Sequence, residues 1–165
     1  MWNGSAGFRD SELKRHKSCA YDGSIADCGF RIAKKQMGDV MRETVETKNA
    51  PGPIGPYSQA IRANGFLFVS GQIPIDPATG SIVTGGIEEQ TRQVMKNLAA
   101  ILEAAGSGLA KVVKTSIFMT NLDDFARLNR IYGEFLGNDK PARSTVQVAR
   151  LPKEVLVEIE AVAIA

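Results

Sequence analysis

The residues best able to do chemistry in this chain lie near its C-terminus. Arg143 belongs to a short strand-like run, and Glu158 and Glu160 belong to the next one. Residues 41–165 contain no histidine and no cysteine. Because these two side chains supply many general acids, nucleophiles and metal ligands, any reaction here must rely on guanidinium, carboxylate, hydroxyl and backbone groups.

Glu158 and Glu160 are expected on one face of a strand. Side chains alternate between faces, so both carboxylates lie opposite Val157 and Ile159, about 6.5–7 Å apart at the backbone. Carboxylates this close alter each other's protonation, and a partly buried glutamate is a candidate general base. The alternative is that both form salt bridges or face solvent, as most strand glutamates do.

Other polar groups could bind a ligand. Arg143 has the planar fork that holds a carboxylate through two hydrogen bonds. The alternative is a surface arginine paired with a local acid, and composition does not distinguish Arg143 from Arg150. Gly71 follows Ser70, and its missing side chain would let a ligand approach backbone N–H groups; the alternative is that it simply ends a strand. Tyr57 lies in a proline-rich loop, where a phenol often anchors the loop by packing.

The charge distribution argues against several functional classes. The chain has 20 basic and 18 acidic residues, of which residues 1–40 hold seven and five, leaving 13 of each sign in the remainder. A neutral domain is a poor candidate for binding nucleic acid through its phosphates. The sequence lacks a run of ~18 apolar residues, so no membrane span is expected. No credible targeting signal is present either, which predicts a cytoplasmic location.

Residues 1–40 are expected to be a poorly ordered, non-core extension of a domain at 41–165. They show no sustained period of 2 or 3.6 residues. An over-long start or a leader would explain them, and a genuine tail with its own partner is the alternative. His16, Cys19 and Cys28 fall here, but their spacing fits no standard zinc site, so no metal is expected.

Residue patterns predict the elements that must position these groups. Two helices with apolar stripes are expected, one at about 87–105 that ends at Gly106, and one that Asn121 caps and that runs to about 136. Strands are expected at 58–62, 66–70, 112–120, 145–149 and 155–163. The order β-β-α-β-α-β-β predicts a two-layer α+β domain in which both helices pack on one sheet.

The last strand carries apolar residues on both faces, with Leu156 and Val162 opposite Val157 and Ile159. A small two-layer domain leaves one sheet face uncovered, and that face must be polar or meet a partner. We therefore expect an oligomer, although the pattern does not specify the number of subunits.

Five consecutive motifs resemble the RidA/YjgF family of reactive intermediate deaminases, formerly labelled ribonuclease-type inhibitors of protein synthesis. Within residues 43–165 they are GPIGPYSQA, FLFVSGQIPIDPATG, NLAAILEAAG, VVKTSIFMTNLDDFARLNRIYGEFL and PARSTVQVARLPKEVLVEIEAVA. The resemblance implies a chorismate-mutase-like fold and a homotrimer with three clefts between neighbouring subunits. It also implies hydrolysis of 2-imino acids, or their 2-enamino tautomers, to 2-keto acids and ammonia, with no metal and no organic cofactor.

The resemblance further implies roles for individual residues. Arg143 would hold the substrate carboxylate together with the backbone N–H of Thr145, a position where the family often has cysteine. Glu158 would position or activate the attacking water, which leaves Glu160 a structural role. The cleft would be lined by Tyr57, Ser70, Gly71 and Asn129.

Two other functions share parts of this pattern. A non-catalytic sensor or chaperone for small keto or amino acids would need the Arg143 clamp but not Glu158. A ribonuclease or translation inhibitor, suggested by the family's older label, is disfavoured by the zero net charge of residues 41–165. The lack of a histidine acid–base pair disfavours it as well.

Overall fold

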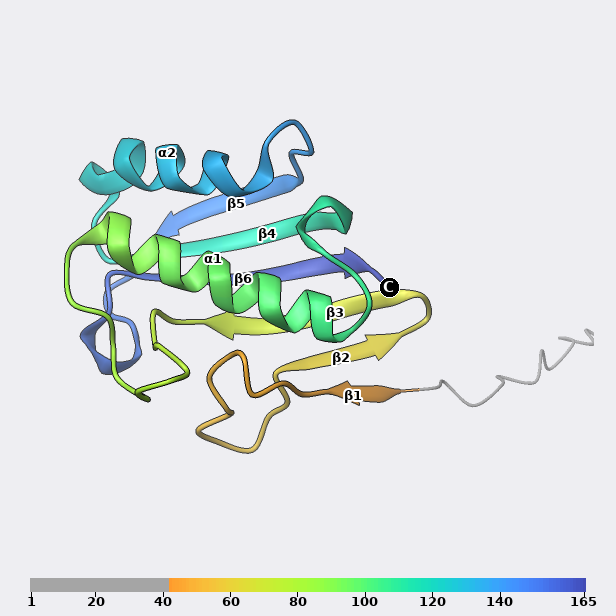
Figure 1. Cartoon of the computed structure of the whole chain (residues 1–165). Helices are drawn as coiled ribbons and strands as arrows, with labels where there is room; N and C mark the ends of the chain where they lie inside the picture. Colours follow the sequence, from red (N-terminus) through yellow and green to blue (C-terminus); the bar gives the residue numbers. More distant parts are fainter. Residues whose placement is uncertain (1–41) are drawn as a thin grey trace, which may run out of the picture. The chain divides into compact units, whose positions relative to one another are not determined.

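The computed structural model describes residues 42–165, which form a six-stranded sheet and two helices (Figure 1). The strands are β1 Glu43–Val45, β2 Ala60–Ala63, β3 Phe66–Gln72, β4 Val112–Met119, β5 Ala142–Gln147 and β6 Val157–Ile164. The helices are α1 Ile87–Ala104 and α2 Phe125–Leu136. The predicted extension at 1–40, with its histidine and cysteines, lies outside the described residues.

The strand order across the sheet is β1-β2-β3-β6-β4-β5. β4 and β5 pair in parallel, while the other neighbours are antiparallel, so the sheet is mixed. A parallel pair needs a crossover connection, and α2 supplies it between β4 and β5. Both helices cover the same face of the sheet, with α1 packed over β3 and β6 (Figure 1).

The structure corrects some strand boundaries. β1 was not predicted, because three residues are too few to show an alternating pattern; it is held by antiparallel pairing with β2. β5 covers 142–147 instead of 145–149, since its position is set by the parallel pairing with β4, which joins Lys114 to Ala142 and Met119 to Gln147. This register places Arg143 within the strand.

The predicted end of α1 is confirmed, whereas α2 begins later than predicted, at Phe125, because Asn121 caps a short 3-10 turn before it. Gly106 takes a φ of +72°, and the N–H of Ser107 donates to the carbonyl of Leu102 at 2.9 Å, which closes α1 with a Schellman turn. The Asn121 side chain accepts the N–H of Asp123 at 3.0 Å and caps the short 3-10 turn that leads into α2. These caps fix where each helix meets the sheet.

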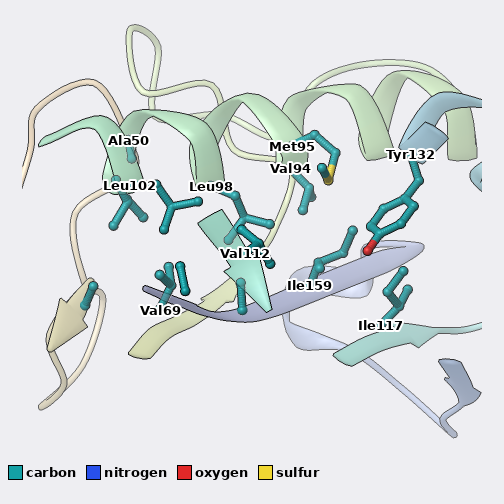
Figure 2. Packing of buried hydrophobic residues seen from close by; sticks show 14 of the residues in the cluster. Ala50, Val69, Val94, Met95, Leu98, Leu102, Val112, Ile117, Tyr132 and Ile159 are labelled. Atoms are coloured by element: carbon teal, nitrogen blue, oxygen red, sulfur yellow. The ribbon is translucent and has the colours of Figure 1, made fainter. Parts of the chain in front are cut away.

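The core lies between the helices and one sheet face (Figure 2). The α1 residues Val94, Leu98 and Leu102 are at most 1% exposed and pack toward the sheet, where Ile117 and Ile159 are fully buried. Burying a side chain of this size stabilises the fold by roughly 1.5–3 kcal/mol. The predicted alternation of β6 is confirmed, because Val157, Ile159, Ala161 and Ala163 all face this core.

The opposite face of the sheet is not covered by any described element. It exposes Phe66, Phe68 and Ile164, with 43–49% of each residue accessible, and it also carries Val162 and both β6 glutamates. Among residues 42–165 of one chain, β6 is therefore buried on one face only. None of the described helices is both long and apolar enough for a membrane span.

Candidate active site

The predicted site residues gather in two hollows. A cavity of about 400 Å³ is lined by Ile54, Tyr57, Ser70, Gly71, Ile73, Pro152, Glu158 and Glu160. A second, of about 420 Å³, is lined by Asn129, Tyr132, Gly133, Leu136, Gly137, Lys140, Pro141 and Arg143. We call them the glutamate cavity and the arginine cavity.

The arginine cavity holds its guanidinium in a defined orientation. Arg143 Nη1 donates to Asn129 Oδ1 at 2.6 Å, and the guanidinium carbon lies 5.4 Å from the ring centre of Phe125 and 5.2 Å from that of Tyr132. Both distances fit cation–π contacts. The side chain is held by α2 yet remains exposed, so further N–H groups can meet a ligand carboxylate.

The aromatic support is itself fixed by the sheet. Tyr132 is 7% exposed, and its hydroxyl lies 2.7 Å from the Thr115 hydroxyl of β4, the residue that pairs with Arg143 in the sheet register. Burial raises the pKa of Tyr132, which keeps the ring a neutral phenol. Phe125 and Tyr132 belong to the apolar stripe expected for this helix, and an aromatic pair three or four residues from Asn129 was the available signal of their role.

The structure distinguishes the two candidate arginines. Arg150 donates from Nε to Glu154 Oε1 at 2.7 Å, a local pair four residues apart. Arg143 has no acidic partner among the described residues and lines a cavity instead. The local-acid interpretation therefore fits Arg150, while Arg143 has the surroundings of a ligand-binding residue.

In the glutamate cavity, Glu158 lies against Gly71. A Cβ at position 71 would lie 2.0 Å from Glu158 Oε1 and 2.9 Å from its Cδ, closer than real atoms approach. Gly71 has no left-handed backbone angle, so its missing side chain is explained by this contact alone. A ligand was one expected occupant of the space beside this glycine; within one chain, the Glu158 carboxylate lies there.

Burial raises the pKa of Glu158, and the negative charge of Glu160 raises it further. Glu158 is half-buried, whereas Glu160 is exposed. A carboxylate with a raised pKa accepts protons more readily near neutrality, which suits a general base.

One buried amide and two hydroxyl groups form hydrogen bonds that shape the loops around the glutamate cavity. Gln59, 2% exposed, donates from Nε2 to the Pro51 carbonyl at 2.8 Å and accepts the Thr47 N–H at 2.7 Å. Ser70 Oγ donates to the Ser58 carbonyl at 2.7 Å, and the Tyr57 hydroxyl accepts the Ile54 N–H at 3.3 Å. These contacts hold the proline-rich loop over the cavity.

Comparisons with known proteins agree with this architecture. The family described as Endoribonuclease L-PSP matches residues 47–165. A RutC family protein of Pyrococcus horikoshii is 58% identical over 123 residues, which are 74% of this chain and 98% of the relative. A human protein named 2-iminobutanoate/2-iminopropanoate deaminase is 44% identical over 128 residues, 78% of this chain and 93% of that protein.

The chain belongs to the RidA/YjgF family. The solved structure of the Rid family protein YyfA of Yersinia pestis superposes with a TM-score of 0.74 at 54% identity, covering 75% of this chain and 99% of that one. The family resemblance and the predicted two-layer α+β fold are therefore confirmed.

Within one chain, this Rid protein separates its predicted site residues. Tyr57, Ser70 and Gly71 meet Glu158 on the uncovered side of the sheet. Arg143 and Asn129 lie on the side that the helices cover, because β5 residue 143 shares the face of Thr115, which is buried in the core. The predicted carboxylate-binding residue Arg143 and the predicted water-positioning residue Glu158 of a single chain therefore do not face each other.

Thr145 lies two residues beyond Arg143, on the same face of β5. Its hydroxyl is buried and has no hydrogen-bond partner in the described part of the chain.

Across residues 42–165, no cluster of three or more histidine, cysteine, aspartate and glutamate side chains could hold a metal ion.

Proposed function

We propose that this Rid protein hydrolyses reactive 2-imino acids, and their 2-enamino tautomers, to 2-keto acids and ammonia. The observation that carries the proposal is the presence of two half-sites: an oriented guanidinium that has no acidic partner among residues 42–165, and a carboxylate with a raised pKa in a cavity. The human relative named as such a deaminase supports the same reaction.

The proposed site forms between two copies of the chain. Because Arg143 and Glu158 lie on opposite faces of the sheet, they can meet across a cleft only if they come from different subunits. A head-to-tail ring supplies such clefts, and three copies give the homotrimer that the family resemblance implies. The apolar residues on the uncovered sheet face would be buried in that assembly.

Binding would begin at the substrate carboxylate. The Arg143 fork and the backbone N–H of Thr145 would hold it, and Asn129 would keep the guanidinium in place through the 2.6 Å hydrogen bond. Tyr57, Ser70 and Gly71 of the neighbouring copy would line the other wall. Fixing the acid group in this way places the C=N carbon over Glu158, and orientation alone can lower a barrier by several kcal/mol.

Hydrolysis then needs a water molecule and one proton carrier. The imine reacts in its N-protonated form: the water oxygen bonds to the imine carbon, the π electrons move to nitrogen and leave an NH2 group there, and Glu158 accepts a proton from the water. Glu158 returns this proton to the nitrogen. The C–N bond breaks with its electron pair on the departing ammonia, and the hydroxyl proton passes to Glu158 as the keto group forms. A positioned carboxylate typically contributes about 10²–10⁴-fold.

A coupled assay tests the proposal. Threonine dehydratase releases a 2-imino acid, and the purified protein should shorten its lifetime while 2-keto acid and ammonia appear in equal amounts. Glu158 works in its ionised form, so the rate should fall as the pH drops through its pKa. Because that pKa is raised, the loss should begin at higher pH than for an ordinary glutamate. An unchanged imine lifetime at every pH would refute the proposal.

Replacing Gly71 with alanine should displace Glu158. The new Cβ would overlap the carboxylate, whose flexible end must move, so the fold survives while the base is misplaced. A shift of about 1 Å can cost up to about 10²-fold, so we expect a loss of that order in kcat. Gly108→Ala is the matched control, because a Cβ there meets nothing within 4 Å. Equal activity of the two variants would contradict the packing of Glu158 on Gly71.

A further inference from the structure

Both β6 glutamates face one cavity. Glu158 and Glu160 lie two residues apart on the uncovered face, and each lines the glutamate cavity of about 400 Å³. Glu160 also borders a smaller hollow of about 170 Å³ together with Lys114 and Ser116 of β4. The second carboxylate is therefore part of the wall around the first one, and the proposed reaction assigns it no role.

The charge of this pair is not neutralised within the described part of the chain. No lysine or arginine nitrogen of residues 42–165 lies within 4.0 Å of either carboxylate. On the β3 side the pair faces the uncharged Phe68 and Ser70. On the β4 side Lys114 lines the smaller hollow, but its Nζ donates to Ser144 Oγ at 2.7 Å.

Two further elements adjoin the pair. The proline-rich loop contributes the Tyr57 phenol to the cavity, and the turn before β6 contributes Pro152. The same turn carries two charged residues. Lys153 lines a different hollow, and Glu154 pairs with Arg150. In the proposed assembly, Arg143 of the neighbouring copy would also face Glu158.

We infer that Glu160 is a positioning residue of this site that acts on the Glu158 carboxylate through its negative charge, because the two side chains share one strand face and one cavity and no cation of residues 42–165 lies within 4.0 Å of either. A nearby negative charge disfavours ionisation of its neighbour, and on a strand face this interaction persists because the backbone fixes the spacing. The direction agrees with the raised pKa of Glu158, to which burial contributes most and Glu160 next.

The catalytic consequence rests on the proposed function. A carboxylate that binds protons more tightly takes the proton of the attacking water more readily, and it still delivers that proton to the leaving nitrogen. Glu160 would thus replace part of the basicity that a histidine provides elsewhere. Residues 41–165 contain no histidine.

The test is a ¹³C NMR titration of the glutamate side chains in the full-length protein, with Glu160→Gln as the variant. Removing the charge should move the Glu158 midpoint to lower pH, and Glu160→Asp should keep it close to the wild-type value. Glu154→Gln is the control, because that exposed glutamate pairs with Arg150 and lines neither hollow. It should leave the Glu158 midpoint in place.

The acid limb of the pH–rate profile should move in the same direction in Glu160→Gln, with KM little changed. A Glu158 midpoint that stays fixed in Glu160→Gln, or that moves equally in Glu154→Gln, would overturn the inference. If the midpoint moves as expected but the wild-type protein hydrolyses no imine, the coupling stands and the proposed function fails.

Discussion

Replacing Arg143 with alanine is expected to lower kcat/KM for 2-imino acids by roughly 10²–10⁴-fold. The variant loses two hydrogen bonds from a charged donor to the substrate carboxylate, each contributing about 1.5–3 kcal/mol. The fold should persist, because Arg143 is exposed and surface substitutions usually change stability by less than about 0.5 kcal/mol. Single-turnover kinetics and a thermal melt would measure the two effects separately.

Arg150→Ala is the matched control for this result. Arg150 lies in the same C-terminal segment, carries the same charge and is exposed, but it contacts Glu154 instead of a cavity. Its removal should leave kcat/KM within about twofold, since an exposed ion pair contributes at most about 1 kcal/mol even to stability. If both arginine variants keep full activity, the assignment of the carboxylate clamp is wrong.

Replacing Glu158 with glutamine should lower kcat by about 10²–10⁴-fold while leaving the binding of a 2-keto acid nearly intact. The amide keeps the size of the side chain and its packing on Gly71, but it cannot accept the proton of water. Binding is expected to persist because the acid group of the ligand is held at the other half-site. Calorimetry measures the binding of a 2-keto acid, and the coupled assay measures kcat.

This variant also separates catalysis from simple binding. If the protein were a sensor or chaperone for small acids, Glu158→Gln would leave its biological role intact, and the wild-type protein would not shorten imine lifetimes. Glu154→Gln serves as the control, because it removes an exposed carboxylate outside both cavities. A Glu158→Gln variant with wild-type turnover would remove the proposed general base from the reaction.

The sequence was most informative where a pattern repeats. The alternation of β6 correctly separated the buried Val157 and Ile159 from the two glutamates. The Gly106 cap of α1 was also correct, because it depends on local chemistry only, and Asn121 forms a cap on the 3-10 turn that precedes α2. Their success reflects short-range interactions that do not depend on strand order.

Features that depend on distant pairing could not be derived in this way. Whether Arg143 and Glu158 share a face depends on the strand order β6-β4-β5 and on its register, and neither follows from periodicity. The choice of Arg143 over Arg150 likewise needed the position of α2, whose Phe125, Asn129 and Tyr132 hold the guanidinium. The close contact between Gly71 and Glu158 joins two strands far apart in sequence.

The most direct test of a site shared between copies is to mix the two inactive variants. Arg143→Ala retains Glu158, and Glu158→Gln retains Arg143, so a cleft between the two different chains can contain both groups. After joint refolding in equal amounts, about one quarter of the clefts in a head-to-tail ring should be intact, and activity should rise toward that fraction of wild type. Activity no higher than that of the separate variants, in a sample that native mass spectrometry shows to contain mixed oligomers, would contradict the account.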